Sequence, residues 1–137
     1  MQQIDAAAID TVGIPRLLLM EHAGLALARS VDSVAASRGS AVPRRSQPIV
    51  VCCGSGFNGG DGMCAARHLY EKGYQLQVAV VGGLDRLRDE PATYATILQR
   101  LGGPLLEVGV PEAIAQLGRW MEACGVIVDA LLGIGVR

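Results

Sequence analysis

Hydrophobic residues in the first quarter of the chain recur at three- and four-residue steps, which is the pattern of amphipathic helices. The pattern predicts a short helix over 3–12, which Gly13 and Pro15 stop, and a longer helix over 14–36. The apolar stripe of the longer helix consists of Leu17, Met20, Ala23 or Gly24, Leu27, Val31 and Val34. We therefore expect an N-terminal helical pair with one face packed against the rest of the protein.

The remainder of the chain alternates short apolar runs with helical patterns. The run "IVVCC" at 49–53 has no polar alternation, which is typical of a strand buried on both faces. Regular alternation of strands and helices predicts an α/β sandwich of three layers, with a mostly parallel sheet covered on both faces and right-handed crossovers. The predicted strands are 49–53, 75–83, 104–109 and 125–133, and the predicted helices between them are 61–72, 91–101 and 111–123.

Composition indicates one packed globular domain. The chain has 137 residues, 50% hydrophobic and 18% charged, with a net charge of −1. This near-neutral balance, with only 4% aromatic residues, argues against nucleic acid or an anionic membrane as a partner. Four cysteines without a C-x-x-C pair, and two histidines, give a zinc site little support and indicate a reducing compartment. With neither a signal peptide nor a membrane span in the sequence, we expect a cytoplasmic protein.

The stretch "CGSGFNGGDG" follows the first strand and precedes a helix. Its Gly54, Gly56 and Gly59 fit G-x-G-x-x-G, in which bare backbone and a helix N-terminus bind phosphate. The second strand, however, ends in "VVGG" without the acid that binds a ribose hydroxyl, and no G-K-[ST] follows the loop. The stretch therefore predicts a phosphate-binding loop that is neither the dehydrogenase fingerprint nor a P-loop.

Three polar residues near this loop have competing interpretations. Asp61 is as well explained by an N-cap as by a ligand contact, and Asn58 taken alone is better explained as a turn residue. Asp129 interrupts the apolar run "VIVDALL", where a buried carboxylate is costly unless it is paired or metal-bound. We therefore favour a functional role for Asp129, at the carboxyl edge of the sheet where ligands bind.

Other polar residues and the cysteines are more simply explained by packing. Glu21 and His22 fit a helix-packing or helix-surface pair, and His68 fits a surface position. Cys52 and Cys53 alternate faces of a strand and have no base nearby in sequence that would make them nucleophiles.

Three stretches carry a resemblance to a known family: "AIDTVGIPRLLLMEHAG" (8–24), "CGSGFNGGDGMCAARHL" (53–69) and "VDALLGIG" (128–135). In this order they resemble the YjeF N-terminal domain family, the NAD(P)H-hydrate epimerases, over nearly the whole chain. The resemblance implies a Rossmann-like sandwich that binds hydrated NADH or NADPH and interconverts the R and S hydrates. It also implies that a separate ATP- or ADP-dependent dehydratase acts on the S hydrate and restores the normal nucleotide.

The resemblance further implies a potassium ion bound by Asn58 and Asp129, whose oxygen ligands suit a hard cation. Phe57 stands where the family usually has a first asparagine. The family's later D-x-P-S-G segment, with an acid suited to proton transfer, is not in the chain, so no catalytic residue is assigned and we interpret 1–137 as a C-terminally incomplete epimerase domain. The implied substrate contacts are Phe57, Asn58, Gly59, Gly60, Asp61, Gly133, Ile134, Gly135, Val136 and Arg137.

Two further expectations concern partners and an alternative function. A homodimer through the N-terminal helices and a dehydratase partner domain are the protein partners under consideration. The alternative to the enzyme is a non-catalytic nucleotide-binding or scaffold module of the same fold, because fold alone does not fix function. An ordinary dehydrogenase is disfavoured by the missing ribose acid.

Overall fold

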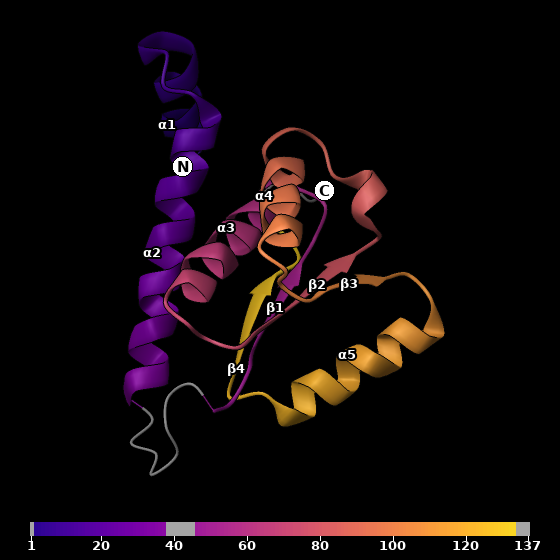
Figure 1. The fold of residues 1–137 in the computed structure, drawn as a ribbon. Helices are drawn as coiled ribbons and strands as arrows, with labels where there is room; N and C mark the ends of the chain where they lie inside the picture. Colours follow the sequence, from indigo (N-terminus) through magenta and orange to yellow (C-terminus); the bar gives the residue numbers. More distant parts are fainter. Residues whose placement is uncertain (1, 38–45, 134–137) are drawn as a thin grey trace.

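Four strands form one parallel sheet in the order β3-β2-β1-β4 (Figure 1). The computed structural model describes residues 2–37 and 46–133. All three strand pairings are parallel, which confirms the parallel sheet predicted from the alternation of strands and helices. The strands are β1 (Ile49–Cys53), β2 (Leu76–Val81), β3 (Leu105–Val108) and β4 (Val126–Ala130).

The central strand, β1, is buried along its whole length, as its unbroken apolar run predicts. Val51 pairs with Val78 of β2 on one side and with Val128 of β4 on the other. From β1 the chain passes first to β2 and β3, and later returns to β4 on the opposite side. The strand order therefore reverses at β1, and a crevice is expected outside the carboxyl ends of β1 and β4.

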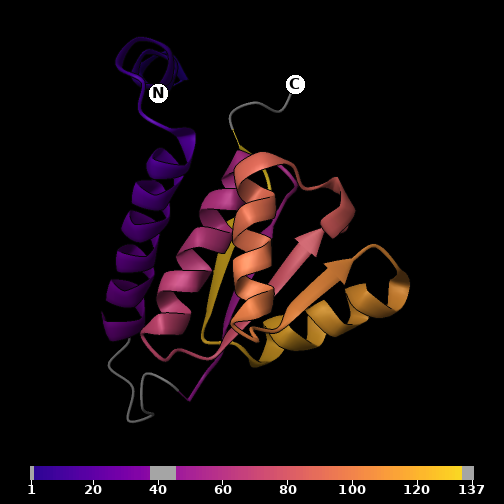
Figure 2. The same ribbon diagram turned by 45° about the horizontal axis from the view of Figure 1, so that its top comes forward.

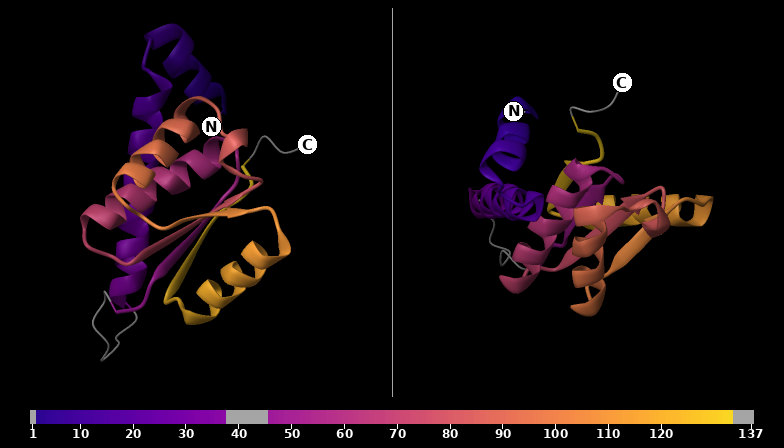
Figure 3. Two further views of the ribbon diagram at one scale, coloured as in Figure 1. Left: turned by 45° about the vertical axis from the view of Figure 1, so that its right-hand side comes forward. Right: turned by 90° about the horizontal axis from the view of Figure 1, so that it is seen from above.

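Helices lie on both sides of this sheet. Figure 2 shows α2, α3 and α4 side by side, and Figure 3 shows α5 on the opposite side of the sheet from α3 and α4. None of the helices in the described parts of the chain is long and apolar enough to cross a membrane. The helical elements are α1 (Gln2–Ala7), the π-helical turn η1 (Ala8–Val12), α2 (Arg16–Ser37), α3 (Phe57–Glu71), the 3-10 turn η2 (Leu84–Arg86), α4 (Asp89–Arg100) and α5 (Pro111–Ala123).

The main core lies between the sheet and the face covered by α2, α3 and α4. Fully buried side chains include Val51 and Val80 from the sheet and Met63 and Leu69 from α3. Burying an apolar side chain of this size contributes about 1.5–3 kcal/mol. This packing fixes α3 against β1, so the start of α3 has a defined place at the carboxyl edge of the sheet.

The second face of the sheet is covered only in part, so the predicted covering of both faces is right for the first face and incomplete for the second. Only Ala113 of α5 is buried, and Ile127 on β4 is 46% exposed. Val126, Val128 and Ala130 alternate with Ile127 and Asp129 along β4 and are the more buried set. A single helix about 10 Å wide is too narrow for a sheet of four strands spaced about 4.8 Å apart.

The long N-terminal helix buries most of the predicted stripe, including Met20, Gly24 and Val31, but not its two ends. Leu17 and Val34, expected in the stripe, are 40% and 45% exposed. The buried positions are Met20, Gly24, Ala28 and Val31. Small residues are buried because α2 lies close to α3: a Cβ on Gly24 would lie 2.3 Å from the Cys64 sulfur. Gly13 ends η1 in a left-handed conformation, with φ of 80°, as its place in the sequence predicts.

The helix after the glycine stretch begins earlier than predicted. We expected it over 61–72, but α3 begins at Phe57, so Gly59, Gly60 and Gly62 are helical. Glycine is a weak helix former, which is why the sequence favoured a loop here. Packing contacts of these glycines, described below, override that propensity.

Candidate active site at the carboxyl edge of β1 and β4

The turn between β1 and α3 is tied directly to the end of β4. The Gly54 N–H donates a hydrogen bond to the Ala130 carbonyl over 3.0 Å. Gly56 is the N-cap residue of α3, with extended backbone and no side-chain cap. The start of α3 therefore lies at the carboxyl ends of β1 and β4, where the crevice was expected. Its first amides have no acceptor within the helix and carry the positive end of the helix dipole.

Four of the five glycines in this stretch are pressed against the protein itself. A Cβ on Gly54 would lie 2.1 Å from the Leu131 carbonyl oxygen, and one on Gly59 would lie 1.9 Å from the Gly54 carbonyl oxygen. A Cβ on Gly60 would lie 2.6 Å from the Met20 side chain of α2, and one on Gly62 would lie 2.6 Å from the Ala130 Cβ of β4, whereas a Cβ on Gly56 would have nothing within 4 Å. These four glycines therefore let the β1–α3 turn and α3 approach their neighbours, a packing role that the sequence did not predict.

Asn58 and Asp129, the two residues implied as potassium ligands, bond to consecutive residues after β4. The Asn58 Nδ2 donates to the Leu132 carbonyl over 3.0 Å, and the Asp129 Oδ1 accepts from the Leu131 N–H over 3.0 Å. Asp129 is exposed, so the argument from the cost of burying its carboxylate was wrong. Its side chain instead caps the end of β4, and the structure brings both residues to the same short loop.

The donor chemistry of this loop suits a hard cation. Asn58 Oδ1 and Asp129 Oδ2 receive no hydrogen bond from the described residues, so each offers an oxygen to a ligand. Cys52 is the β1 partner of Asp129. Burial raises the pKa of the Cys52 thiol, and the charge of Asp129 raises it further, so Cys52 stays protonated. The residues present therefore fit a hard cation, which prefers oxygen, better than a metal that prefers thiolate.

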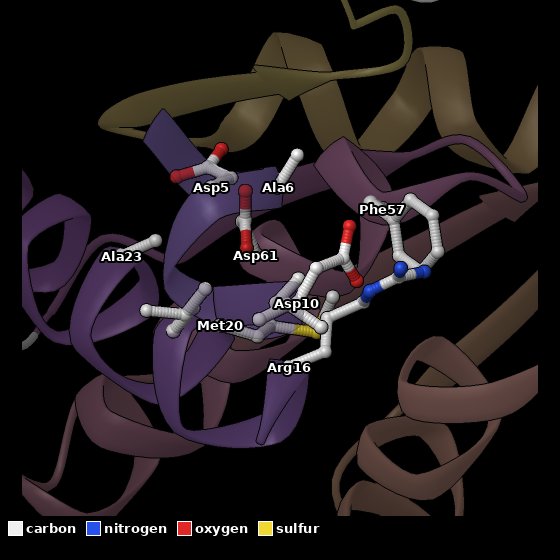
Figure 4. Close-up of a pocket in the computed structure, with 10 residues that line it drawn as sticks. Asp5, Ala6, Asp10, Arg16, Met20, Ala23, Phe57 and Asp61 are labelled. Carbon is white, nitrogen blue, oxygen red and sulfur yellow. The ribbon is translucent and has the colours of Figure 1, made fainter. Parts of the chain in front are cut away.

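Phe57 and Asp61 lie on another side of α3, at a cavity shared with the N-terminal helices (Figure 4). The cavity has a volume of about 500 Å³. The Phe57 ring is 47% exposed, and the Cζ of Arg16 lies 4.7 Å from its centroid, a cation–π contact. The lining residues are Asp5 and Ala6 of α1, Ile9 and Asp10 of η1, Arg16, Leu19, Met20 and Ala23 of α2, and Phe57 and Asp61 of α3.

Asp61 is not the N-cap of α3, which was one of its two interpretations, because the helix begins four residues earlier. Burial raises the pKa of its carboxyl from 3.8 to about 6, and the nearby charge of Asp5 adds to the effect. A carboxyl group whose pKa lies near neutral pH, beside a cavity, is typical of functional sites. Among the predicted contacts after β4, Gly133 lies beside Asn58 and not at the cavity, since a Cβ on it would lie 3.1 Å from the Asn58 Cβ. Ile134, Gly135, Val136 and Arg137 lie outside the described residues.

A second polar cluster joins α2, α3 and α4 around Glu21. Its Oε1 pairs with Arg67 and lies 2.8 Å from His68 Nε2, and its Oε2 accepts from the Tyr94 hydroxyl over 2.6 Å and from Cys64. Burial raises the Glu21 pKa, but the hydrogen bonds from Tyr94, Cys64 and Arg67 outweigh it and lower the pKa to about 2. The cluster therefore holds a carboxylate firmly charged between three helices.

This cluster has the ligand types of a metal site, but its groups are already occupied. Ligand atoms of Glu21, Cys64 and His68 lie within 4.8 Å of one another. The Arg67 guanidinium fills one side of the carboxylate, and burial raises the Cys64 pKa to about 12. We interpret the cluster as an interhelical clamp. Of the two positions predicted for Glu21, helix surface or helix packing, the structure shows packing. The surface position predicted for His68 is wrong, because its side chain is only 15% exposed and lies against Glu21. The sequence gave no sign that Tyr94, 73 residues away, completes the cluster.

Comparisons with known proteins show which proteins this chain is similar to. The family model described as "YjeF-related protein N-terminus" matches residues 16–137. The chain is 39% identical over 128 residues to a bifunctional NAD(P)H-hydrate repair enzyme of Pyrobaculum aerophilum, covering 92% of the chain and 23% of that protein. It is 31% identical over its full length to an NAD(P)H-hydrate epimerase of Rhodopirellula baltica, of which it covers 51%.

A solved structure shares the fold as well. The crystal structure of the yeast protein ynu0 superposes with a TM-score of 0.80 and 27% sequence identity, over 99% of this chain and 55% of that one. The chain thus spans about half the length of the epimerase and of the yeast protein, and about a quarter of the bifunctional enzyme.

Proposed function

Because the chain belongs to the YjeF-related N-terminal family, we propose that it is an NAD(P)H-hydrate epimerase, an isomerase of damaged nicotinamide nucleotides. It would interconvert the R and S forms of hydrated NADH and NADPH. The observation that carries this proposal is the convergence of Asn58, Asp129 and the start of α3 on one loop at the carboxyl edge of the sheet. This is the place where a doubly wound sheet binds its ligand.

The proposed resident ion is potassium, held by Asn58 and Asp129. Epimerases of this family are in general metal-dependent, which supports an ion at this loop. Bound there, the ion would supply positive charge that offsets the negative charge of the nucleotide. The protein's own contribution is to fix two oxygen donors, one through Leu132 and the other through Leu131.

The proposed substrate contacts are Phe57, Asn58, Gly59, Gly60 and Asp61 at the start of α3, with Gly133, Ile134, Gly135, Val136 and Arg137 after β4. The α3 amides, with the positive end of the helix dipole, suit a phosphate group. No proton-transfer residue is assigned. A homodimer and a dehydratase that consumes the S hydrate remain the proposed partners, and the reducing interior of the cell is the proposed location.

The direct test is to incubate separated R and S hydrates with the protein in potassium chloride and follow both by chromatography. We expect interconversion faster than the spontaneous rate. Asn58→Ala and Asp129→Ala should each slow it at least about tenfold, because each removes an oxygen from the proposed ion site. Glu122→Gln, a change on exposed α5, serves as the control and should have no effect.

Two results would contradict the proposal. Full activity in both the Asn58 and Asp129 variants would show that these residues do not form an ion site needed for the reaction. Tight binding of NAD(P)H hydrates without any interconversion would instead support the non-catalytic nucleotide-binding module of the same fold.

A further inference from the structure

The cavity between the N-terminal helices and α3 combines two kinds of recognition chemistry. On one side, the Arg16 guanidinium lies over the exposed Phe57 ring. Three carboxylates, those of Asp5, Asp10 and Asp61, line the rest of its polar surface (Figure 4). No ion pair between Arg16 and an acid is found among the described residues. The cavity therefore has a flat cationic and aromatic platform beside a surface of net negative charge.

These features favour some ligand groups and disfavour others. Carboxylates accept hydrogen bonds from the hydroxyls of a ribose diol, which is how many nucleotide sites recognise ribose. A planar base stacks on aromatic and guanidinium surfaces. A phosphomonoester carries a charge of about −1.5 to −2 at neutral pH and would be repelled by the carboxylates. The volume, about 500 Å³, suits a ligand of nucleoside size.

We infer that this cavity binds one nucleoside half of the dinucleotide, with the base on the Arg16–Phe57 pair and the ribose diol toward Asp5 and Asp10, and that it rejects a phosphorylated ribose. The inference rests on the proposed function, because Phe57 and Asp61 belong to the same proposed substrate site. Both halves of the dinucleotide carry a ribose diol, but in the NADPH form the adenosine diol is blocked by phosphate. The cavity thus extends the site with recognition residues from α1, η1 and α2.

The test is a titration of the protein with adenosine, nicotinamide riboside and adenosine 2′-phosphate, followed by NMR chemical shifts. We expect at least one nucleoside to bind about tenfold or more tightly than adenosine 2′-phosphate. Tighter binding of adenosine assigns the cavity to the adenosine half and makes the NADH hydrate the preferred substrate. Tighter binding of nicotinamide riboside assigns it to the nicotinamide half and leaves both hydrates as substrates. Either result supports the inference.

Variants distinguish recognition by the cavity residues from a general effect of the protein's charge. Asp10→Asn and Asp5→Asn should each narrow the preference for the nucleoside over adenosine 2′-phosphate by about three- to tenfold, allowing for salt screening. Arg16→Ala should weaken nucleoside binding several-fold, because the base loses its platform. Glu122→Gln removes an exposed carboxylate from α5, which lies on the other face of the sheet, and should leave the preference unchanged.

The inference is overturned if neither nucleoside binds, if adenosine 2′-phosphate binds as tightly as both nucleosides, or if the aspartate variants leave the preference unchanged. Its failure is distinguishable from failure of the proposed function. If the protein interconverts the hydrates but shows no preference for the nucleoside, the nucleoside cavity is disproved and the epimerase proposal stands. If the protein prefers the nucleoside but does not interconvert the hydrates, the epimerase proposal is disproved and the nucleoside cavity stands.

Discussion

The start of α3 and the loop after β4 meet at the same edge of the sheet but are built in opposite ways. At the start of α3, glycines touch backbone and side chains so closely that a single added carbon would collide with them. Around the end of β4, Asp129, Leu131 and Leu132 are exposed, and the side chain of Asn58 reaches this loop through one hydrogen bond. One side of the site is fixed by packing, and the other is held mainly by polar contacts.

This difference changes how the glycine stretch is understood. A glycine-rich loop is usually read as bare backbone offered to a phosphate. Here four of the five glycines also serve the protein's own packing, because an added Cβ on each would collide with a neighbour. The rigid part thus positions Asn58, Phe57 and Asp61, while the open part supplies Asp129. Substitutions at the start of α3 should therefore affect stability, and substitutions at the loop after β4 should affect binding.

The largest expected effect is on the packed side. Gly59→Ala should destabilise the protein by about 2–4 kcal/mol, because the new Cβ would lie 1.9 Å from the Gly54 carbonyl oxygen and the backbone must move. Gly56→Ala is the matched control, since Gly56 has nothing within 4 Å and an ordinary φ of −90°. Urea unfolding measures both. Equal midpoints for the two variants would show that the glycines are not packing residues.

A smaller effect is expected at the interhelical clamp that supports the packed side. Glu21→Gln should lower the free energy of unfolding by about 1–3 kcal/mol at pH 7, because Arg67 loses its charged partner. Glu71→Gln, which removes the more exposed partner of Arg67, should change it by less than about 0.5 kcal/mol.

The clamp also predicts a pH dependence. The Glu21 pKa is about 2 in the folded protein and 4.5 as a free group, so its contribution is complete above pH 4.5 and is lost as the pH falls toward 2. The acid unfolding curve of Glu21→Gln should therefore be flatter than that of the wild type over this window. Parallel curves for the two proteins would contradict the charged clamp.

Asp61 provides a prediction of opposite sign. Its folded pKa, about 6, lies above the free value of 3.8, so the ionised carboxylate is a cost that appears as the pH rises from 3.8 to 6. Asp61→Asn should stabilise the protein by about 1–2 kcal/mol at pH 7, after allowance for solvent screening, and by almost nothing at pH 3.5. Thermal unfolding at the two pH values measures this. Destabilisation at pH 7 would mean that Asp61 is a structural residue.

The smallest effect is expected on the thinly covered second face. Gly118→Ala on α5 should stabilise the protein by about 0.5–1 kcal/mol, because an added Cβ meets nothing within 4 Å and alanine is the better helix former. Calorimetry measures the change. A loss of stability would show that Gly118 is in close contact with neighbouring atoms, contrary to the structure.

Local pattern predicted the elements of this fold well, and long-range packing accounts for the errors. The run at 49–53 identified the central strand, and Pro111 marked the start of α5. The start of α3 was misplaced because glycine propensity favours a loop, whereas Gly60 and Gly62 pack against Met20 and Ala130 within the helix.

The candidate site could be predicted in part. The motif resemblance singled out Asn58 and Asp129, and the structure joins both to the loop after β4, although the reason given for Asp129, its burial, was wrong. The Arg16–Phe57 pair and the acidic wall of the cavity were not predicted, because they depend on how η1 and α2 pack beside α3. No spacing rule within the sequence contains that information.

The most direct test of the central claim, that Asn58 and Asp129 form one ion site, is thermal unfolding in potassium chloride and in sodium chloride of equal ionic strength. At potassium concentrations tenfold above the dissociation constant, binding should add about 1.4 kcal/mol and raise Tm by roughly 3–6 °C relative to sodium. Asn58→Ala and Asp129→Ala should each abolish this difference, and the double variant should have no further effect. Equal Tm values in the two salts, or a potassium effect that survives both substitutions, would contradict this claim.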